Sequence, residues 1–253
     1  IQAPNGIVLV TGPTGSGKNT TLYAALAELN NEEVNICTVE DPVECNMAGI
    51  NQFQVNQKAG FEFSTALRSL LRQDPDIIMV GEIRDEATAN IAVQAALTGH
   101  LVLSTLHTND APGAVTRLLD LGVAPYLVSA SLIAVLAQRL VRKICPNCKT
   151  EYEPSASIRK IVEGTGGEVV KFFRGVGCKK CRNTGYAGRI AIHELFVPNE
   201  ETAGMINERT GLKEIKNMAL KNGMVPLQAD GIEKVKAGIV SVEEVLRTAQ
   251  GEQ

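Results

Sequence analysis

The most informative stretch of the sequence is the glycine-rich segment at residues 12–19. It follows an apolar β-type segment, residues 7–11, and leads into a helix-like segment, residues 20–27. Strand, glycine-rich turn and helix form the context in which a P-loop binds phosphate. The glycines allow backbone N–H groups to curl around an anion, and the N-terminal end of the helix adds its positive dipole. A glycine-rich surface turn is the alternative, but it does not account for a lysine in register with both flanks. We therefore predict that ATP or ADP binds through Gly12, Pro13, Thr14, Gly15, Ser16, Gly17, Lys18, Asn19 and Thr20.

One position departs from the P-loop pattern. Lys18 is in register to reach the β- and γ-phosphates, but the next residue is Asn19, where the pattern has a Ser or Thr hydroxyl that ligates Mg²⁺. An amide oxygen lies one atom further out, and Mg²⁺ tolerates displaced ligands poorly. Thr20 carries a hydroxyl, but it points about 100° further around the helix. We expect nucleotide binding to persist and Mg²⁺-dependent turnover to be impaired.

Charged side chains follow three of the strands that the sequence predicts. Glu44 lies in an acidic loop after one strand, Glu82 follows the apolar run 76–80, and His107 follows the strand 101–106. In open α/β sheets ligands bind at the carboxyl ends of the strands, so these groups are candidates for the catalytic site. Either glutamate could polarise the attacking water while the other holds Mg²⁺, and the sequence leaves both assignments open. The competing interpretation is a solvated or helix-capping glutamate, and a histidine packed near the sheet edge.

Several arginines are candidates for compensating phosphate charge. An arginine from a neighbouring subunit can stabilise the transition state of phosphoryl transfer, whereas the alternative for any one of them is an ordinary surface charge on a helix. We also count Arg84 among the catalytic candidates. The full set is Arg68, Arg72, Arg84 and Arg117.

Four of the six cysteines form two pairs with metal-ligand spacing, Cys145-x2-Cys148 and Cys178-x2-Cys181, with 29 residues between the pairs. Four thiolates in this pattern favour tetrahedral structural zinc. An Fe–S cluster and a dithiol redox pair are the alternatives. Residues 142–189 carry a net charge of about +7, part of which balances the metal thiolates; the rest could face acidic lipid or a partner, or could simply be a solvated surface.

Composition narrows the class of protein. The chain has 253 residues, 44% of them hydrophobic, which is enough to fill a core. Aromatic residues make up 4% and the net charge is −3, so neither base-stacking platforms nor a surface charged for nucleic acid is expected. No apolar run approaches the roughly 20 residues that span a bilayer. The cysteine usage favours a reducing compartment, and the start at Ile1, just before a strand, leads us to expect further protein upstream.

Strands that alternate with helices predict an α/β fold, a P-loop core with a mostly parallel sheet. We expect helices around 114–121 and 126–140 before the cysteine region, and further helices at 212–220, 229–236 and 242–248. The predicted division is a core over 1–141, a tetracysteine zinc-binding region over 142–189 and a helical C-terminal lobe over 190–253.

These motifs together resemble the ATPases of type II secretion and type IV pilus assembly. The resemblance is carried by the P-loop, the acidic box 40–44, Gly81-Glu82-Ile83-Arg84-Asp85, the stretch from Thr98 to Asp110, both cysteine pairs, and Gly185 to Glu194. It covers essentially the whole chain. Two features depart from the family: Asn19 stands where the family has Ser, and the domain that precedes the core in the family is absent from this chain.

The resemblance implies a RecA-like core, a hexameric ring on the cytoplasmic face of the inner membrane, and ATP hydrolysis that drives pilin or pseudopilin assembly. It implies hydrolysis and Mg²⁺ handling at Glu44 and Glu82, a γ-phosphate contact at His107, structural zinc on the four cysteines, and arginines acting between subunits at the positions of Arg68, Arg72 and Arg117. The partners it implies are an inner-membrane platform and a cytoplasmic adaptor of the machine. Pilus-retraction relatives lack the cysteine pairs, so the chain resembles an assembly motor.

Two rival functions stay open at this point. A nucleotide-binding ring component that does not hydrolyse ATP fits Asn19 and Gly81, which together remove both usual direct Mg²⁺ ligands. A zinc-containing nucleic-acid translocase would bind DNA or RNA in a salt-sensitive way, against which the composition counts.

Overall fold

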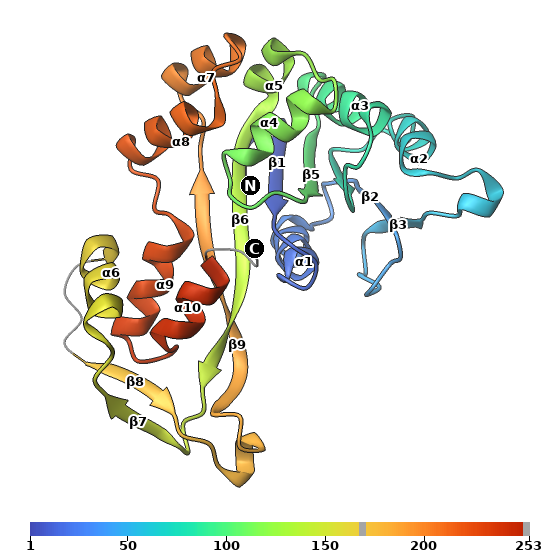
Figure 1. The fold of residues 1–253 in the computed structure, drawn as a ribbon. Coiled ribbons are helices and arrows are strands. Elements are labelled where there is room, and N and C mark those ends of the chain that lie inside the picture. The colour runs from blue at the N-terminus through green and yellow to red at the C-terminus, as the bar shows by residue number, and fades with distance from the viewer. Residues whose placement is uncertain (167–170, 250–253) are drawn as a thin grey trace. The chain divides into compact units, whose positions relative to one another are not determined.

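The computed structural model describes residues 1–166 and 171–249, so parts of the predicted cysteine region and C-terminal lobe, 167–170 and 250–253, lie outside the described residues. Seven strands form one sheet in the order β3-β2-β4-β5-β1-β6-β9 (Figure 1), and β7 and β8 form a second, two-stranded sheet. Strand pairs β1·β5, β1·β6, β2·β3, β2·β4 and β4·β5 are all parallel. The predicted α/β fold with a mostly parallel sheet is confirmed.

By its internal contacts the described chain divides into two compact units. The first contains residues 1–13, 18–137 and 195–224, and the second contains residues 14–17, 138–194 and 225 to the C-terminal end. The three-part division predicted from the sequence stays a prediction.

The first unit holds most of the parallel sheet and the helices around it. Its strands are β1 (Gly6–Thr11), β2 (Ile36–Glu40), β3 (Asn51–Gln54), β4 (Ile77–Val80), β5 (Leu101–Leu106) and the beginning of β6 (Leu132–Ile144). Its helices are α1 (Lys18–Leu29), η1 (Gln57–Ala59), α2 (Phe63–Leu70), α3 (Glu86–Leu97), α4 (Gly113–Asp120), α5 (Pro125–Ser131), α7 (Glu200–Asn207) and α8 (Leu212–Lys221).

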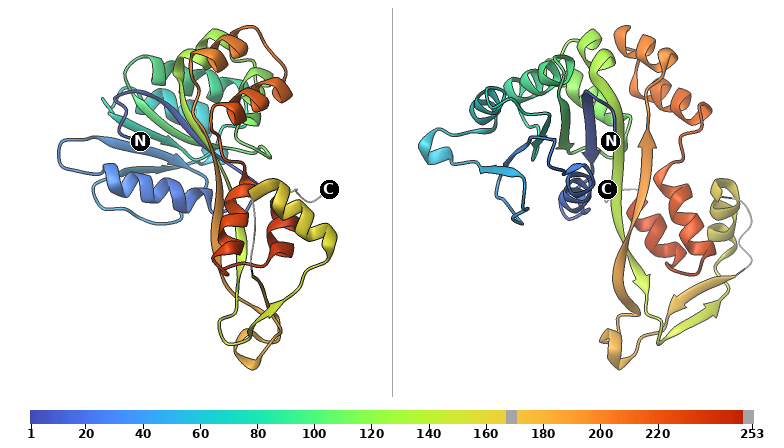
Figure 2. Two further views of the ribbon diagram at one scale, coloured as in Figure 1. Left: turned by 90° about the vertical axis from the view of Figure 1, so that its left-hand side faces the viewer. Right: turned by 180° about the vertical axis from the view of Figure 1, so that it is seen from behind.

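Helices cover both faces of this sheet, as two views of the ribbon show (Figures 1 and 2). Successive side chains of a strand point to opposite faces, and the sequence uses this alternation. Val10, Met79 and Leu103 pack on one face with Leu22 and Leu26 of α1. The intervening strand residues are also fully buried, toward α3, which contacts β1 and β5. A sheet buried on both faces explains the continuous apolar runs of its strands.

The second unit contains the cysteine region and the last two helices. Its elements are the end of β6, β7 (Lys149–Tyr152), α6 (Ala156–Gly166), β8 (Phe172–Gly175), η2 (Lys179–Cys181), β9 (Tyr186–Phe196) up to Glu194, α9 (Leu227–Lys236) and α10 (Val242–Ala249). β7 and β8 pair in the antiparallel sense. Gly175 and Gly185 approach so closely that a Cβ on Gly175 would lie 1.9 Å from the Gly185 carbonyl oxygen, which explains glycine at that crossing.

One predicted helix is wrong. The expected helix 126–140 ends at Ser131, and Leu132–Ile144 forms β6 instead. The Leu- and Ala-rich run has good helix propensity, but its first half pairs in parallel with β1, from Ile7 opposite Leu132 to Thr11 opposite Ala137. Tertiary pairing therefore overrides local propensity here. The helices expected at 114–121, 212–220, 229–236 and 242–248 are confirmed as α4, α8, α9 and α10.

Within the described residues, no helix combines the length and the apolar character needed to cross a bilayer.

Candidate nucleotide site and tetracysteine centre

The P-loop joins the end of β1 to the beginning of α1. Gly12, Gly15 and Gly17 have φ values of 149°, 79° and 87°, in the region that residues with a Cβ avoid. A Cβ on Gly17 would also lie 2.8 Å from Nε2 of Gln138. That same Nε2 donates to the Ser16 carbonyl oxygen at 2.7 Å. The loop is therefore held in a curled conformation that favours glycine at these positions.

Lys18 folds back over this loop. Its Nζ donates to the carbonyl oxygens of Gly12 at 2.8 Å and Pro13 at 3.0 Å, and the side chain is buried. The hydroxyl of Ser16 is buried too and has no hydrogen-bond partner among the described residues. A curled glycine backbone, with the Lys18 ammonium group held beside it and a buried Ser16 hydroxyl that lacks a partner among the described residues, fits a phosphate group.

Three of the predicted catalytic side chains come together beyond the ends of β4 and β5. Glu82 forms an ion pair of 2.5 Å with Arg84 and lies 3.8 Å from Nε2 of His107. Burial and the Lys18 ammonium group lower the pKa of His107, against the opposing effect of Glu82. His107 thus lies within electrostatic reach of the P-loop lysine, and its imidazole is predominantly neutral at pH 7.

The other predicted glutamate lies beside the beginning of α1. Nδ2 of Asn19 donates to Oε1 of Glu44 at 2.7 Å, and the Glu44 backbone N–H donates to the hydroxyl of Tyr23 at 3.1 Å. Tyr23 in turn donates to the buried carboxylate of Glu40. Glu44 is exposed and Glu40 is buried, so the two ends of the acidic box have different environments.

Gly81 replaces the carboxylate expected at the end of β4, and the packing gives a reason. A Cβ at this position would lie 3.3 Å from the Val39 carbonyl oxygen and 3.4 Å from Cα of Glu40. Because backbone atoms of β2 lie this close, a side chain at position 81 would require them to shift by a few tenths of an ångström.

The arginines proposed to act between subunits lie on the surface of the first unit. Arg68 is on α2, Arg72 lies two residues beyond the end of that helix and Arg117 is on α4, and all three are exposed. Their exposure leaves them available to a neighbouring subunit, while their roles stay predictions.

The four predicted metal ligands converge in the second unit. Their Sγ atoms all lie within 4.8 Å of one another, and the individual separations are 3.9 Å for Cys145–Cys178, 3.9 Å for Cys148–Cys181 and 3.7 Å for Cys178–Cys181. Thiolates arranged tetrahedrally at about 2.3 Å from a metal ion are about 3.8 Å apart, so the cluster has the dimensions of a four-sulfur metal site.

Backbone donors support one of these sulfurs. The amides of Cys178 and Gly185 donate to Sγ of Cys181 at 3.2 and 3.3 Å. Positive φ values at Arg182 and Asn183, 54° and 60°, turn the chain back after the second pair. Such N–H···S contacts stabilise a thiolate ligand.

The interactions of Tyr23, Glu40 and Gln52 were not predicted from the sequence. Glu40 accepts hydrogen bonds from Thr38 at 2.6 Å and from Gln52 at 3.1 Å. The one available signal was the spacing of Asn19 and Tyr23, four residues apart and therefore on the same face of α1.

Comparison with known proteins agrees with this architecture. The sequence profile of the family described as "Type II/IV secretion system protein" matches residues 1–247. The chain belongs to this family. It is 52% identical over 250 residues to the type II secretion system ATPase E of Vibrio cholerae, covering 99% of this chain and 50% of that protein. It is 52% identical over 249 residues to the type IV pilus assembly ATPase PilB of Myxococcus xanthus, covering 97% of this chain and 44% of that one.

Two solved structures share the fold of this chain. The pilus retraction motor PilT, crystallised with bound ADP, matches with a TM-score of 0.71 and 29% identity over 96% of this chain and 60% of that one. The Legionella pneumophila ATPase DotB matches in fold with a TM-score of 0.69. This family member spans about half the length of the curated relatives it matches.

Proposed function

We propose that this chain is the ATPase module of a machine that assembles pseudopilin or pilin filaments, in type II secretion or type IV pilus biogenesis. Its relatives, each about twice as long, are ATPases of these two systems. The observation that carries the proposal is that Glu82, Arg84 and His107 lie together, with His107 within electrostatic reach of Lys18 in a P-loop whose curled glycines fit a phosphate group.

Each group has a role in this proposal. Lys18 leaves the carbonyl oxygens of its own loop and binds the β- and γ-phosphates, and His107 contacts the γ-phosphate as a neutral imidazole. Glu82 polarises the attacking water while Arg84 holds its carboxylate in place. Glu44 lies beside Asn19, where Mg²⁺ handling is expected.

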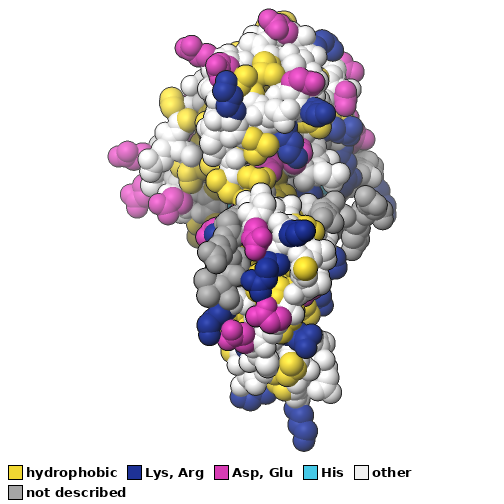
Figure 3. All heavy atoms as spheres, turned by 60° about the vertical axis from the view of Figure 1, so that its left-hand side comes forward, with side chains coloured by type: hydrophobic (Ala, Val, Ile, Leu, Met, Phe, Trp, Pro, Cys, Tyr) yellow, Lys and Arg dark blue, Asp and Glu magenta, His cyan; other side chains and the backbone are white. Residues whose placement is uncertain are grey.

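Assembly into a hexameric ring is the second part of the proposal. Arg68, Arg72 and Arg117 would then reach the nucleotide of an adjacent subunit. The ring would dock on a membrane platform and an adaptor protein at the cytoplasmic face of the inner membrane. Lys and Arg side chains are interspersed with Asp and Glu on the face drawn in Figure 3, a mixed surface that favours a protein partner over a purely lipid one. We do not expect nucleic acid as a partner.

The tetracysteine centre is proposed to hold structural zinc. Four sulfur ligands leave no open coordination position, so the metal would fold the second unit and take no part in hydrolysis.

The test is nucleotide binding together with phosphate release. Lys18→Ala should abolish binding of ATP, because it removes the cation that meets the phosphates. Glu82→Gln should keep binding and lower phosphate release by a hundredfold or more. Lys58→Ala, at an exposed lysine of η1, is the matched control and should behave as the parent. Binding that survives Lys18→Ala unchanged would refute the nucleotide site.

A ring component that binds ATP without hydrolysing it is the second candidate, and the contact between Asn19 and Glu44 favours it. Phosphate release that stays at the level of Lys18→Ala, in a protein that binds ATP normally, would support this alternative over the motor. Adding DNA or RNA to the same assay tests the translocase hypothesis, which requires that nucleic acid stimulate phosphate release.

A further inference from the structure

The acidic loop that carries Glu44, between β2 and β3, is held to one face of α1 by hydrogen bonds. Asn19 and Tyr23 are four residues apart, so their side chains project from the same side of the helix. Asn19 donates its amide to the Glu44 carboxylate at 2.7 Å, and Tyr23 accepts the Glu44 backbone N–H at 3.1 Å. The P-loop helix therefore holds both the backbone and the side chain of Glu44.

The tyrosine contact is directional. Tyr23 uses its hydroxyl proton to bind the carboxylate of Glu40, which is 4% exposed, and so can only accept from Glu44. Burial and the bond to Glu40 raise the pKa of Tyr23 to about 12, so the hydroxyl stays protonated at any pH at which the protein works. The orientation of the acidic loop is thus fixed by the buried end of β2.

Two glutamines of β3 hold the loop from its other side. Oε1 of Gln54 accepts the Val43 N–H at 3.2 Å. Gln52 accepts the Met47 N–H at 2.7 Å and donates to the Cys45 carbonyl oxygen at 3.0 Å. The loop is consequently positioned before any ligand arrives, and the carboxylate of Glu44 is already satisfied by a protein donor.

The chemistry of the two side chains fixes the polarity of the contact. An ionised carboxylate only accepts hydrogen bonds, so Asn19 must present its NH₂ group to Glu44 and direct Oδ1 elsewhere. A serine hydroxyl at position 19 would end one bond earlier, about 1.5 Å closer to the helix. It could not span the gap to Glu44, and a cation would have to bridge the two oxygens.

We propose that the Asn19 amide takes the place of a divalent cation beside Glu44, so that ATP binding by this chain depends little on Mg²⁺. This inference rests on the proposed nucleotide site. It deepens that proposal by assigning to Asn19 a role in metal response, because the side chain spans a distance that the Ser of related P-loops leaves to a metal ion.

The experiment measures ATP affinity by calorimetry in excess Mg²⁺ and in excess EDTA. The parent should change affinity by less than about threefold between the two conditions. Asn19→Ser should change by about tenfold or more, since it restores the hydroxyl and frees Glu44. Asn31→Ser, at an exposed residue beyond the C-terminal end of α1 whose side chain hydrogen-bonds to Leu29 and Glu33, is the matched control and should respond as the parent does. In the Asn19→Ser background, Glu44→Gln should remove most of the regained Mg²⁺ dependence.

The outcomes separate the two proposals. A tenfold or larger loss of affinity for the parent in EDTA overturns the inference while leaving the nucleotide site intact. Equally small responses of the parent and Asn19→Ser also overturn it, because Asn19 would then not be the cause. Absence of ATP binding by the parent in both conditions overturns the nucleotide site itself and the inference with it.

Discussion

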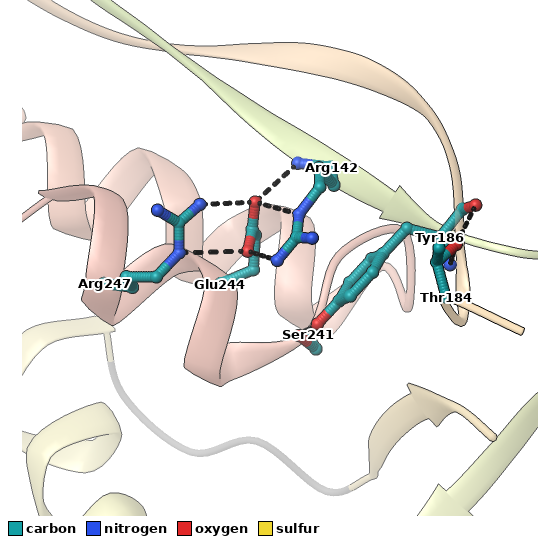
Figure 4. Close-up of polar contacts among 6 residues, drawn as sticks. All are labelled: Arg142, Thr184, Tyr186, Ser241, Glu244 and Arg247. Atoms are coloured by element: carbon teal, nitrogen blue, oxygen red, sulfur yellow. Dashed lines mark hydrogen bonds and ion pairs between the residues drawn. The ribbon is translucent and has the colours of Figure 1, made fainter. Parts of the chain in front are cut away.

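Replacing Glu244 by Gln should weaken the second unit by an amount that depends on pH. Glu244 lies on α10 with its side chain 1% exposed, and Arg142 and Arg247 grip it from two sides (Figure 4). Arg142 donates from Nε at 2.9 Å, from its guanidinium NH2 at 2.7 Å and from its backbone N–H at 3.1 Å. Arg247 adds a contact of 3.0 Å, and the Arg142 guanidinium stacks 4.0 Å above the Tyr186 ring.

The magnitude follows from the proton affinity of this carboxylate. Burial by itself raises the pKa of Glu244, but the donors from Arg142 and Arg247 outweigh it and lower the pKa from 4.5 to about 2. Each factor of ten in proton affinity corresponds to about 1.4 kcal/mol, so the ionised side chain stabilises the fold by about 3 kcal/mol at neutral pH. Because the pKa is depressed on folding, this contribution is complete above pH 4.5 and is lost as the pH falls toward 2. At pH 3 about 1.4 kcal/mol of it remains.

Removing one member of a buried pair costs about 3–5 kcal/mol when its partner is left buried. The side chains of Arg142 and Arg247 are 47% and 53% exposed, so water can solvate them after Glu244→Gln. We therefore expect the loss to lie at the lower end of that range, near 3 kcal/mol.

Hydrogen exchange of the segment 138–144 is the suitable assay, because the two compact units need not unfold together and the Arg142 amide donates directly to Glu244. At pH 7 Glu244→Gln should accelerate exchange about a hundredfold relative to the parent, and at pH 3 only about tenfold. Glu233→Gln is the matched control. It removes a carboxylate that is 62% exposed and paired with Lys236, so it should cost less than about 0.5 kcal/mol.

If the ratio of the exchange rates of variant and parent is the same at pH 7 and pH 3, the reasoning is refuted, since the loss of stability would then come from packing rather than charge. A Glu244→Gln protein as stable as the control variant would refute it as well.

Three further outcomes are expected. Elemental analysis should find about one zinc per chain; Cys181→Ser should lose the metal and Cys45→Ser, outside the cluster, should keep it, whereas iron in the parent would contradict the zinc proposal. A proton NMR titration should place the pKa of His107 below its ordinary 6.5, because burial and the P-loop ammonium group disfavour the imidazolium; bound ATP should raise that pKa by adding negative charge, and no response to ATP would separate His107 from the phosphates. Gly175→Ala should destabilise the cysteine region in urea unfolding by about 2 kcal/mol or more because its Cβ would overlap backbone, while Gly164→Ala, with open space around it, should be neutral or mildly stabilising.

The features predictable from the sequence are those whose signal is local. The P-loop is a strand, a turn and a helix in a row, and each cysteine pair brings its two ligands together by its own spacing. The parallel sheet follows from apolar runs repeated at regular intervals, and its strands β1, β4 and β5 lie where the runs predict. In each case a few consecutive residues determine the structure they adopt.

The features that were not predicted depend on partners distant in sequence. β6 is a strand because β1 lies beside it, although its composition suits a helix. Glu244 is buried because Arg142, 102 residues earlier, neutralises it. Nothing in the sequence around Glu40 indicates that this carboxylate is buried, since Tyr23 and Gln52 come from different elements. Burial of charge is a property of the fold, so local pattern does not reveal it.

Position 19 shows how the two kinds of information combine. The sequence indicates a loss, because Asn19 stands where a hydroxyl would ligate Mg²⁺, and from that alone impaired metal handling is the expected result. The structure adds that the amide reaches the carboxylate of Glu44, which the metal would otherwise help to hold. The substitution therefore exchanges a cation, which comes and goes with nucleotide, for a neutral donor fixed to the P-loop helix. The amide is part of the chain, so a chelator cannot remove it from Glu44. A chelator can remove Mg²⁺ from a site of the usual composition. The nucleotide site of this chain should accordingly respond more weakly to Mg²⁺ than that of the Asn19→Ser variant.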